Sequence, residues 1–216
     1  MKNIDVAVIM AGGKGSRLLS ITNDEIPKPM VPVDGKPLLE YQVEKLKSYG
    51  VKKIIMIVGH LGEKISGHFQ DGKAFGVDID YIFEKEPLGT AGAFYYLKDK
   101  IDAKDFLLIF GDVFFDLDFD RMEAFHFKNS ALTTLLAHPN GHPYDSDLIQ
   151  MDDTGRVIGF DSKHNVRDYW YDNMVNAGMY ILNRDLLDLV KEPVKIDFEK
   201  DILANQVKLG ANIYAY

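Results

Sequence analysis

The 216-residue sequence contains no cysteine, which excludes a disulfide framework and a metal site built from thiolates. It also lacks an apolar run long enough for a signal peptide or a membrane span. Positive charge is scarce, because 33 Asp and Glu residues outnumber 25 Lys and Arg residues and give a net charge of −8. This balance argues against a nucleic-acid-binding surface, although a few local cations can still hold a small anionic substrate. We therefore expect a soluble, cytoplasmic protein with neither a nucleic-acid nor a membrane partner.

What the sequence does contain is an ordinary globular balance, with 46% hydrophobic and 27% charged residues. Short apolar runs at 5–12, 52–59 and 105–112 are typical of buried strands, and patterns at 36–50 and 118–129 are typical of helices. Strands that alternate with helices predict βαβ units. The fold class we expect is α/β, a Rossmann-like, doubly wound and mainly parallel sheet with helices on both faces.

Three details of the predicted elements concern a helix face, two helix caps and the C-terminal part of the chain. In the helix over 36–50, either Tyr41 or Gln42 shares the apolar stripe. Thr90 is the predicted N-cap of a helix over 90–98, and Asp118 that of the helix over 118–129. Beyond His138 the pattern changes to a turn-rich loop, a hairpin around 153–155, a strand over 173–182, a helix over 197–210 and a last strand over 211–216.

A glycine-rich stretch, "AGGKGSRL", follows the first predicted strand and raises the question of phosphate binding. The third glycine of a dinucleotide fingerprint would fall at Leu18, and a P-loop would need a Gly-Lys-Ser/Thr ending that the spacing does not offer. What remains is a glycine turn that lets backbone N–H groups approach an anion. Arg17 adds a guanidinium fork, and Lys28 stands between two prolines. The alternative is that the glycines only turn the chain and that both cations are solvated.

The stretch "AGGKGSRL…PKPM" resembles the signature of the sugar-1-phosphate nucleotidyltransferases. Further motifs follow in the order of that family: "EKEPLGTAGA" at 84–93, "FGDVFFD" at 110–116 and "NAGMYIL" at 176–182. The resemblance implies one nucleotidyltransferase domain over 1–216, with a nucleotide-binding half at 1–137 and a sugar-binding half at 138–216. It also implies that an NTP and a sugar 1-phosphate are joined with release of pyrophosphate, with Mg²⁺ as cofactor.

The resemblance further implies roles for single residues. Arg17, Lys28 and Asp112 would be catalytic, and Asp112 would also bind Mg²⁺ at the end of a strand. The implied nucleotide-binding residues are Ala11, Gly12, Gly13, Gly15, Glu86, Gly89 and Thr90. The implied contacts to the sugar phosphate and the sugar are Lys163, Asn176 and Gly178.

The sequence departs from the family pattern at informative places. Ser162 and His164 flank Lys163 where the family has Glu and Pro, and Ser20 stands where many members have Pro. With Ser20, the chain is most similar to the D-glycero-D-manno-heptose 1-phosphate guanylyltransferases and their mannose-1-phosphate guanylyltransferase relatives. The family's second Mg²⁺-binding Asp would follow the last strand, but the sequence stops at Tyr216. We expect either a fragment or an incomplete metal site, and a last strand with an open edge for pairing with another chain, as in a homo-oligomer.

Two hypotheses of different classes follow. The first is an enzyme that uses an NTP, GTP being the expected one, and a heptose- or mannose-type sugar 1-phosphate. The second is a nucleotide-sugar-binding regulatory module with incomplete catalysis, which the missing second Asp favours and the presence of Arg17, Lys28 and Asp112 disfavours.

Overall fold

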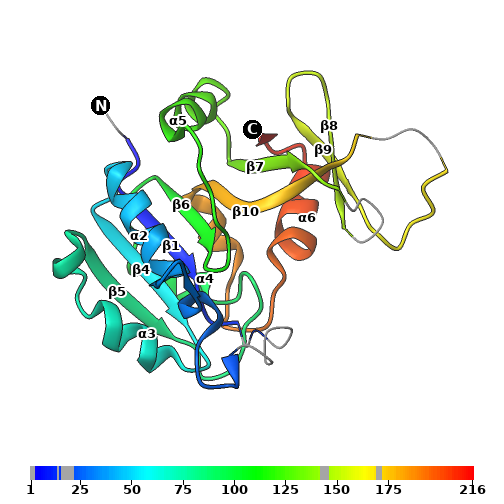
Figure 1. Cartoon of the computed structure of the whole chain (residues 1–216). Helices are drawn as coiled ribbons and strands as arrows, with labels where there is room; N and C mark the ends of the chain where they lie inside the picture. The colour runs from blue at the N-terminus through cyan, green and yellow to red at the C-terminus, as the bar shows by residue number, and fades with distance from the viewer. Residues whose placement is uncertain (1–2, 14, 16–21, 142–145, 169–171) are drawn as a thin grey trace.

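The computed structural model describes residues 3–13, 15, 22–141, 146–168 and 172–216. Within these residues seven strands form one sheet in the order β11-β7-β10-β6-β1-β4-β5 (Figure 1). In chain order these strands are β1 (Val6–Met10), β4 (Lys53–Val58), β5 (Asp78–Phe83), β6 (Asp105–Phe110), β7 (Thr133–Pro139), β10 (Met174–Asn183) and β11 (Ile213–Ala215).

The sheet is mainly parallel, as the sequence predicted. β1 runs parallel to both β4 and β6, β4 runs parallel to β5, and β7 runs parallel to β11. Within the described part of the seven-stranded sheet, only β10 runs antiparallel to both of its neighbours, β6 and β7. The central strands are continuous apolar runs because both faces of the sheet are covered by other elements.

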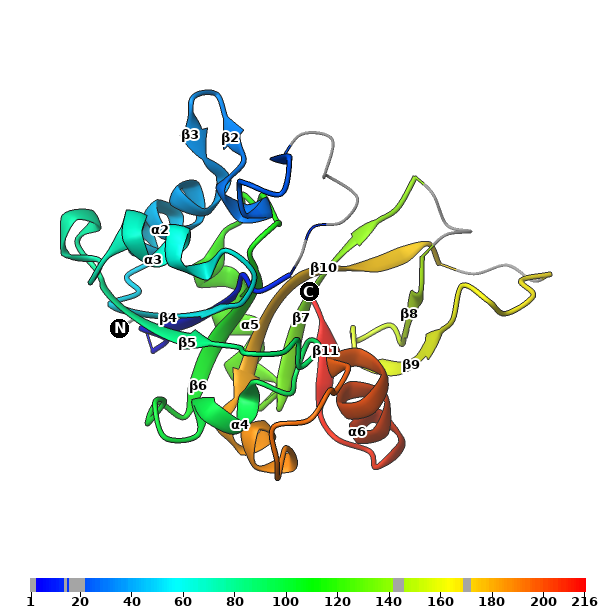
Figure 2. The same ribbon diagram turned by 90° about the horizontal axis from the view of Figure 1, so that it is seen from below.

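Helices cover both faces of the sheet, which confirms the doubly wound prediction (Figure 2). On one face Val43 of α2, Phe69 of α3 and Met122 of α5 share a core with alternate residues of the central strands. On the other face Phe94 of α4 and Phe198 of η5 pack in the second core. The helices are α2 (Leu38–Ser48), α3 (Gly62–Phe69), α4 (Phe94–Leu97), α5 (Phe119–Lys128) and α6 (Ala204–Lys208), with the short turns η2 (Lys28–Met30), η3 (Lys73–Phe75), η4 (Arg184–Leu189) and the π-helix η5 (Phe198–Leu203).

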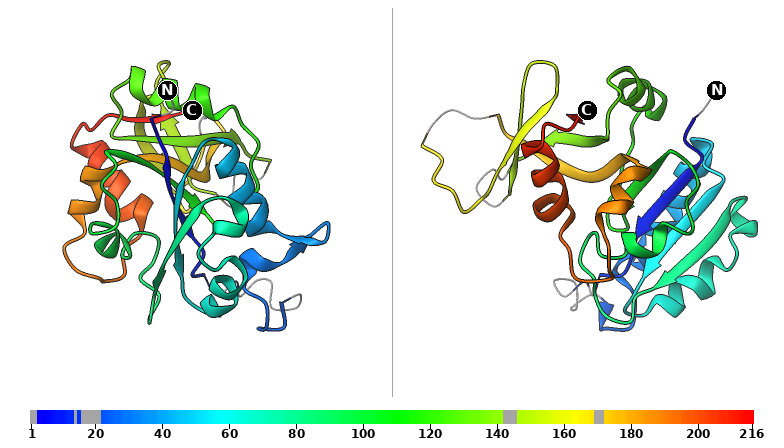
Figure 3. Two further views of the ribbon diagram at one scale, coloured as in Figure 1. Left: turned by 90° about the vertical axis from the view of Figure 1, so that its left-hand side faces the viewer. Right: turned by 180° about the vertical axis from the view of Figure 1, so that it is seen from behind.

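Among the described residues, two small hairpins lie outside the main sheet. They are β2–β3 (Pro32–Val33 and Lys36–Pro37) and β8–β9 (Leu148–Met151 and Val157–Asp161), and the second projects from the body of the molecule (Figure 3). The predicted turn of β8–β9 is present, because the carboxylate of Asp152 accepts hydrogen bonds from Thr154 and Arg156.

The last strand is less open than the sequence predicted. The N–H of Ala215 in β11 donates to the carbonyl of Gly155 over 2.8 Å, and Arg156 forms an antiparallel bridge with Tyr214. The turn of the β8–β9 hairpin therefore occupies part of the outer edge of β11. The edge position of β11 agrees with the prediction, and the partial cover was not predicted because hairpin and strand are far apart in the sequence.

The two predicted helix caps had different outcomes. The Asp118 carboxylate accepts from the N–H of Arg121 and caps α5, as predicted. Thr90 does not cap α4, which begins only at Phe94 after Ala93. The Thr90 hydroxyl instead accepts from the N–H of Phe198 at 2.7 Å. No helix within the described residues is long and apolar enough to cross a membrane.

Candidate active site

The carboxyl ends of four parallel strands meet at one edge of the sheet. Backbone hydrogen bonds continue the strand pairing there, from Ala11 to Ile57 at 2.8 Å and from Glu84 to Val58 at 2.8 Å. The N–H of Gly111 likewise donates to Met10 at 2.9 Å. Residues that follow β1, β4, β5 and β6 are thereby brought together, at the place where open α/β sheets bind ligands.

A cavity of about 350 Å³ opens at this edge, which is a suitable size for a small-molecule site. It gathers residues that the sequence proposed for the site from four separate segments of the chain. Its lining is Met10, Ala11, Gly12, Gly13, Lys28, Pro29, Glu84, Pro87, Gly89, Thr90, Phe110 and Asp112. Predicted phosphate-binding, metal-binding and nucleotide-binding residues therefore share one cavity.

Lys28 and Asp112 form an ion pair in this cavity through Nζ and Oδ2. Their side chains are 34% and 40% exposed, so both remain accessible to a ligand. Lys28 begins η2 between Pro27 and Pro29, whose rings restrict the backbone on both sides of the lysine. The ring of Pro29 also lies against Gly111, the residue before Asp112. Rigid neighbours thus present an ammonium and a carboxylate together.

Gly15 lies against the stem of this lysine. Its φ is +60°, and a Cβ at this position would lie 2.8 Å from the Cβ of Lys28. A side chain at position 15 would therefore displace Lys28, which gives the glycine a packing role that its motif did not indicate. A contact of Gly15 with the nucleotide stays a prediction. Arg17 and Ser20 lie outside the described residues.

Glu84 also lines this cavity, although the sequence did not single it out. Its carboxylate is half-buried, accepts from the N–H of Leu88 at 3.3 Å, and lies so close to Gly12 that a Cβ there would be 2.7 Å from Oε2. Burial raises the pKa of Glu84, and the Leu88 N–H opposes this only in part. The available signal was its position directly after β5, at the ligand-binding edge.

The predicted residue Glu86 lies apart from the main cavity. It is exposed and lines an adjoining hollow of about 260 Å³, together with Gly12, Gly59, His60, Glu84, Lys85 and Pro87. Glu84 lines both spaces, whereas Glu86 lines only the hollow. Of these two carboxylates, Glu84 is therefore the better placed for a ligand that fills the main cavity.

The segment around Gly89 is joined to the C-terminal half of the chain. Gly89 has a φ of +76°, and a Cβ there would lie 2.4 Å from the carbonyl oxygen of Ile196. The N–H of Ala91 donates to the same carbonyl at 3.0 Å. With the Thr90–Phe198 bond, these contacts fix the wall of the cavity to residues more than a hundred positions away.

Asn176 lies in a polar cluster behind the cavity wall. Its Nδ2 donates to the hydroxyl of Tyr180 and to Oε1 of Glu199, and its Oδ1 accepts from the N–H of Gly178 at 2.9 Å. The Tyr180 ring is fully buried and meets the cavity-lining ring of Phe110 edge to face, 6.0 Å between centroids. Burial raises the pKa of Glu199, which the sequence reasoning also missed.

Lys163 is not in the described cavity. It is exposed after β9, and its backbone N–H donates to the Asp147 carboxylate at 2.8 Å. Its predicted contact with a sugar phosphate stays a prediction.

The donor set of the cavity fits Mg²⁺ that binds together with phosphates. Within the described ranges no group of three or more His, Cys, Asp or Glu side chains could form a metal cage. Asp112 and Glu84 are the carboxylates described in the cavity lining. Because Mg²⁺ is commonly bound by one or two carboxylates and completed by substrate phosphates, Asp112 suits a metal that arrives with a nucleotide.

Comparison with known proteins assigns the class. Residues 6–216 match the family described as Nucleotidyl transferase, and the chain belongs to this family. It is 35% identical to the D-glycero-alpha-D-manno-heptose 1-phosphate guanylyltransferase of Campylobacter jejuni, over 95% of this chain and 88% of the relative. It is 31% identical to the UTP–glucose-1-phosphate uridylyltransferase of Synechocystis over 97% of this chain, but spans only 57% of that relative.

A solved structure agrees with this assignment. The crystal structure of HddC from Yersinia pseudotuberculosis complexed with GMP-PN matches with a TM-score of 0.79 and 28% identity, over 99% of this chain and 90% of that one. The predicted family and fold are thus confirmed. The relatives include both guanylyl and uridylyl transferases, so membership of this family is compatible with more than one nucleotide.

Proposed function

We propose that this chain transfers the guanylyl group of GTP to a heptose- or mannose-type sugar 1-phosphate, giving a GDP-sugar and pyrophosphate. The observation that carries the proposal is the cavity in which Lys28, Asp112 and Glu84 come together. The first two suit phosphates and their metal, and the third suits a guanine base.

The reaction needs positioning and positive charge more than a base. An oxygen of the sugar phosphate attacks the α-phosphorus, the bond from this phosphorus to the bridging oxygen breaks, and pyrophosphate leaves with the electron pair. Since the nucleophile is already an anion, the main obstacle is repulsion between like charges. Lys28 would donate to oxygens of the α-phosphate and the incoming phosphate. The role of Arg17 at the β- and γ-phosphates remains a prediction from the sequence.

Asp112 would hold Mg²⁺ together with the phosphates. When bound, the metal supplies positive charge that stabilises the transferring phosphoryl group. Asp112 pairs with Lys28 in the structure, so the carboxylate that would hold the metal lies beside the ammonium that would contact the phosphates. The phosphates would then accept hydrogen bonds from the lysine.

Glu84 supports guanine over uracil. The Watson–Crick edge of guanine offers two adjacent donors, N1–H and the N2 amino group, which a carboxylate can accept together. Uracil offers one N–H between two carbonyl oxygens, which a carboxylate repels. Because Glu84 is half-buried, two donors from the base would offset the cost of its charge. The guanylyltransferase relative from Campylobacter jejuni and the GMP-PN complex of HddC are in line with this choice.

The sugar would lie on the side of the Asn176 cluster. The cluster reaches the cavity through Phe110: the Tyr180 ring meets the ring of Phe110 edge to face, and a Cβ on Gly178 would lie 2.9 Å from Phe110. Hydroxyl groups of a sugar are suited to amide and carboxylate partners of this kind.

The decisive experiment is a panel of four NTPs against mannose-, glucose- and heptose-1-phosphates, with pyrophosphate release as the readout. We expect turnover with GTP and the mannose- or heptose-type substrate. Preferred turnover of UTP would contradict the guanylyl assignment. GTP binding without pyrophosphate release from any combination would favour the regulatory-module hypothesis. Failure of every Mg²⁺–NTP to raise the melting temperature would contradict both.

A further inference from the structure

The connection from β6 to α5 carries Asp112, and one buried side chain from α2 holds it. Gln42 is 2% exposed, and its Nε2 donates to the carbonyl oxygens of Phe110 at 2.9 Å and Val113 at 2.5 Å. We propose that Gln42 is a positioning residue that fixes the backbone of Asp112 and, through it, the direction of the metal-binding carboxylate. This inference rests on the metal role of Asp112 in the proposed function.

The two accepting carbonyls belong to the ends of one turn. The N–H of Val113 donates to the carbonyl of Phe110 at 3.1 Å, so residues 110–113 form a four-residue turn with Asp112 as its third residue. Gln42 binds the first and the last carbonyl of this turn with the same amide group. The turn is therefore held at both ends by a helix that is itself packed in the core through Leu39, Val43 and Leu46.

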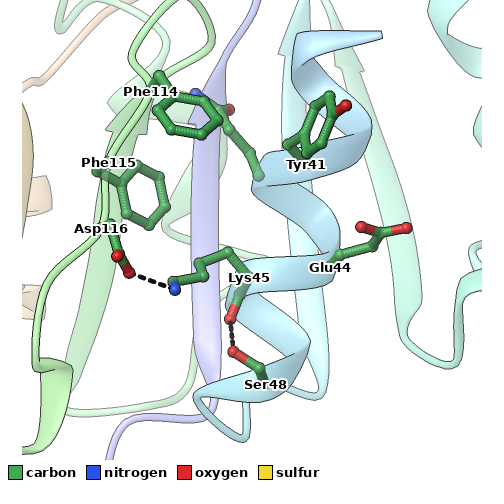
Figure 4. A pocket seen from close by; sticks show the side chains of 8 residues that line it. Tyr41, Glu44, Lys45, Ser48, Phe114, Phe115 and Asp116 are labelled. Atoms are coloured by element: carbon green, nitrogen blue, oxygen red, sulfur yellow. Dashed lines mark hydrogen bonds and ion pairs between the residues drawn. The ribbon is translucent and has the colours of Figure 1, made fainter. Parts of the chain in front are cut away.

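Beyond the turn, the same connection meets α2 and its C-terminal end through aromatic rings, since Tyr41 lies 6.1 Å from Phe114 and Tyr49 lies 6.4 Å from Phe115 between ring centroids. A cavity of about 360 Å³ opens beside these contacts, with Tyr41, Gln42 and Lys45 on the helix and Phe114, Phe115 and Asp116 opposite (Figure 4). Lys45 pairs with Asp116 at 2.5 Å, but the Asp116 side chain is 80% exposed, and such surface pairs contribute little. These contacts restrain residues beyond the turn. Among the described residues, the hydrogen bonds that join α2 to the turn itself are the two that the buried amide of Gln42 donates.

The remaining atom of the amide indicates that Gln42 does more than fill space. Its Oε1 is buried and has no hydrogen-bond partner among the described residues. A buried polar atom without a partner lowers stability, so an apolar side chain of similar length would serve packing better. The two donated bonds are what an apolar side chain could not provide.

The test replaces Gln42 by Met, which keeps the length and removes both donors. Because residues that orient metal ligands typically affect metal affinity or activity by 10–100-fold, we expect Mn²⁺ to bind the GTP complex about 10-fold more weakly, measured by electron paramagnetic resonance. Amide hydrogen exchange of residues 111–116 in the metal-free protein should be about 10-fold faster. Binding of GTP without metal should change less than about 2-fold.

Tyr49→Phe is the matched control, because the hydroxyl of Tyr49, the C-cap residue of α2, also reaches this connection. It donates to the carbonyl of Leu117 at 2.8 Å, five residues beyond Asp112. This variant should lose a comparable hydrogen bond and keep the Mn²⁺ affinity of the wild type. Equal losses of Mn²⁺ affinity in both variants, or normal affinity and exchange in Gln42→Met, would overturn the inference.

A second variant protects the test against misfolding. Gln42→His restores one N–H donor, so its Mn²⁺ affinity should lie between those of wild type and Gln42→Met. If Gln42→Met does not fold, Gln42→His alone tests the positioning role. The inference then requires that Gln42→His binds Mn²⁺ more weakly than the wild type, while its melting temperature falls no further than that of Tyr49→Phe. Hydrogen exchange needs neither nucleotide nor turnover, so it tests Gln42 even if the proposed reaction is wrong.

Discussion

Replacing Glu84 by Gln tests the proposed recognition of guanine by this carboxylate, with almost no change of shape. The amide keeps one oxygen that can accept from the N–H of Leu88 or from guanine. Its NH₂ group, however, would meet a guanine donor where the carboxylate had offered an acceptor. The variant therefore removes one charge-assisted hydrogen bond and places the NH₂ group of the amide opposite an N–H donor of guanine.

The expected loss follows from these two effects. A hydrogen bond to a charged group contributes about 1.5–3 kcal/mol, and an unpaired buried donor adds to the loss. A total of about 2–4 kcal/mol corresponds to a roughly 30- to 1000-fold lower kcat/KM for GTP, at tenfold per 1.36 kcal/mol. UTP should be used better relative to GTP, because the oxygen and NH₂ of an amide match the N–H and carbonyl of uracil.

Stability should move in the opposite direction. Burial raises the pKa of Glu84, so its charged form is costly in the folded protein at neutral pH, and a neutral amide removes this cost. The melting temperature of Glu84→Gln at pH 7 should therefore equal or exceed that of the wild type. A lower activity with an unchanged or higher melting temperature separates loss of base recognition from loss of folding.

The assay is pyrophosphate release with GTP, UTP and ITP, whose base lacks the N2 amino group of guanine. Wild type should prefer GTP to ITP, and Glu84→Gln should lose most of this preference. Glu63→Gln, an exposed change on α3, controls for the loss of one negative charge. Retention of the full GTP-over-ITP preference by Glu84→Gln would refute the base-reading role.

Three further predictions concern the rest of the site. Asp112→Asn should lower pyrophosphate release by about 100-fold or more, because the metal-binding charge is lost. Its melting temperature should fall by less than about 4 °C, since the half-exposed pair with Lys28 contributes about 1 kcal/mol at most. Gly89→Ala should lower the free energy of unfolding by about 2–5 kcal/mol in urea titrations, from the positive φ and the contact with Ile196. Burial raises the pKa of Glu199 above 4.5. The protonated carboxyl therefore contributes fully to the free energy of unfolding below pH 4.5, and this contribution is lost as the pH rises through the raised pKa. Glu199→Gln should not show this decrease of stability with pH.

Each of these outcomes can be contradicted directly. Near-normal turnover of Asp112→Asn would remove the metal assignment. A Gly89→Ala protein as stable as wild type would show that the segment can relax away from Ile196 at little cost. Identical slopes of stability against pH for wild type and Glu199→Gln, between pH 4 and 8, would mean that this carboxyl does not change its pKa on folding.

The central sheet could be predicted from sequence because its strands are buried on both faces. β1, β4 and β6 are continuous apolar runs, a pattern that needs no knowledge of their neighbours. The start of α4 could not be predicted in this way. Thr90 has the chemistry of an N-cap, but its hydroxyl is engaged by Phe198, which is 108 positions away. A local sequence pattern predicts a helix start only where local interactions determine it, and here the hydrogen bond to Phe198 determines what Thr90 does.

The residues of the candidate site also differ in how far local sequence indicates them. Lys28 and Asp112 could be proposed from motif spacing, because glycine, proline and strand-end positions are visible in the sequence. Gln42, Glu84 and Glu199 could not. The helical pattern left open whether Tyr41 or Gln42 faces inward, and the structure buries Gln42.

The three residues that the sequence did not indicate share one physical property. Glu84, Gln42 and Glu199 are polar groups whose burial is created by elements distant in the sequence, and burial is what makes their hydrogen bonds selective. An exposed carboxylate discriminates poorly between bases, because water can replace either partner. A half-buried one penalises any base that leaves it unpaired. The motif residues would therefore bring phosphate and metal together in any family member, whereas the choice of base should depend on the residue that follows β5 and on how deeply it is buried.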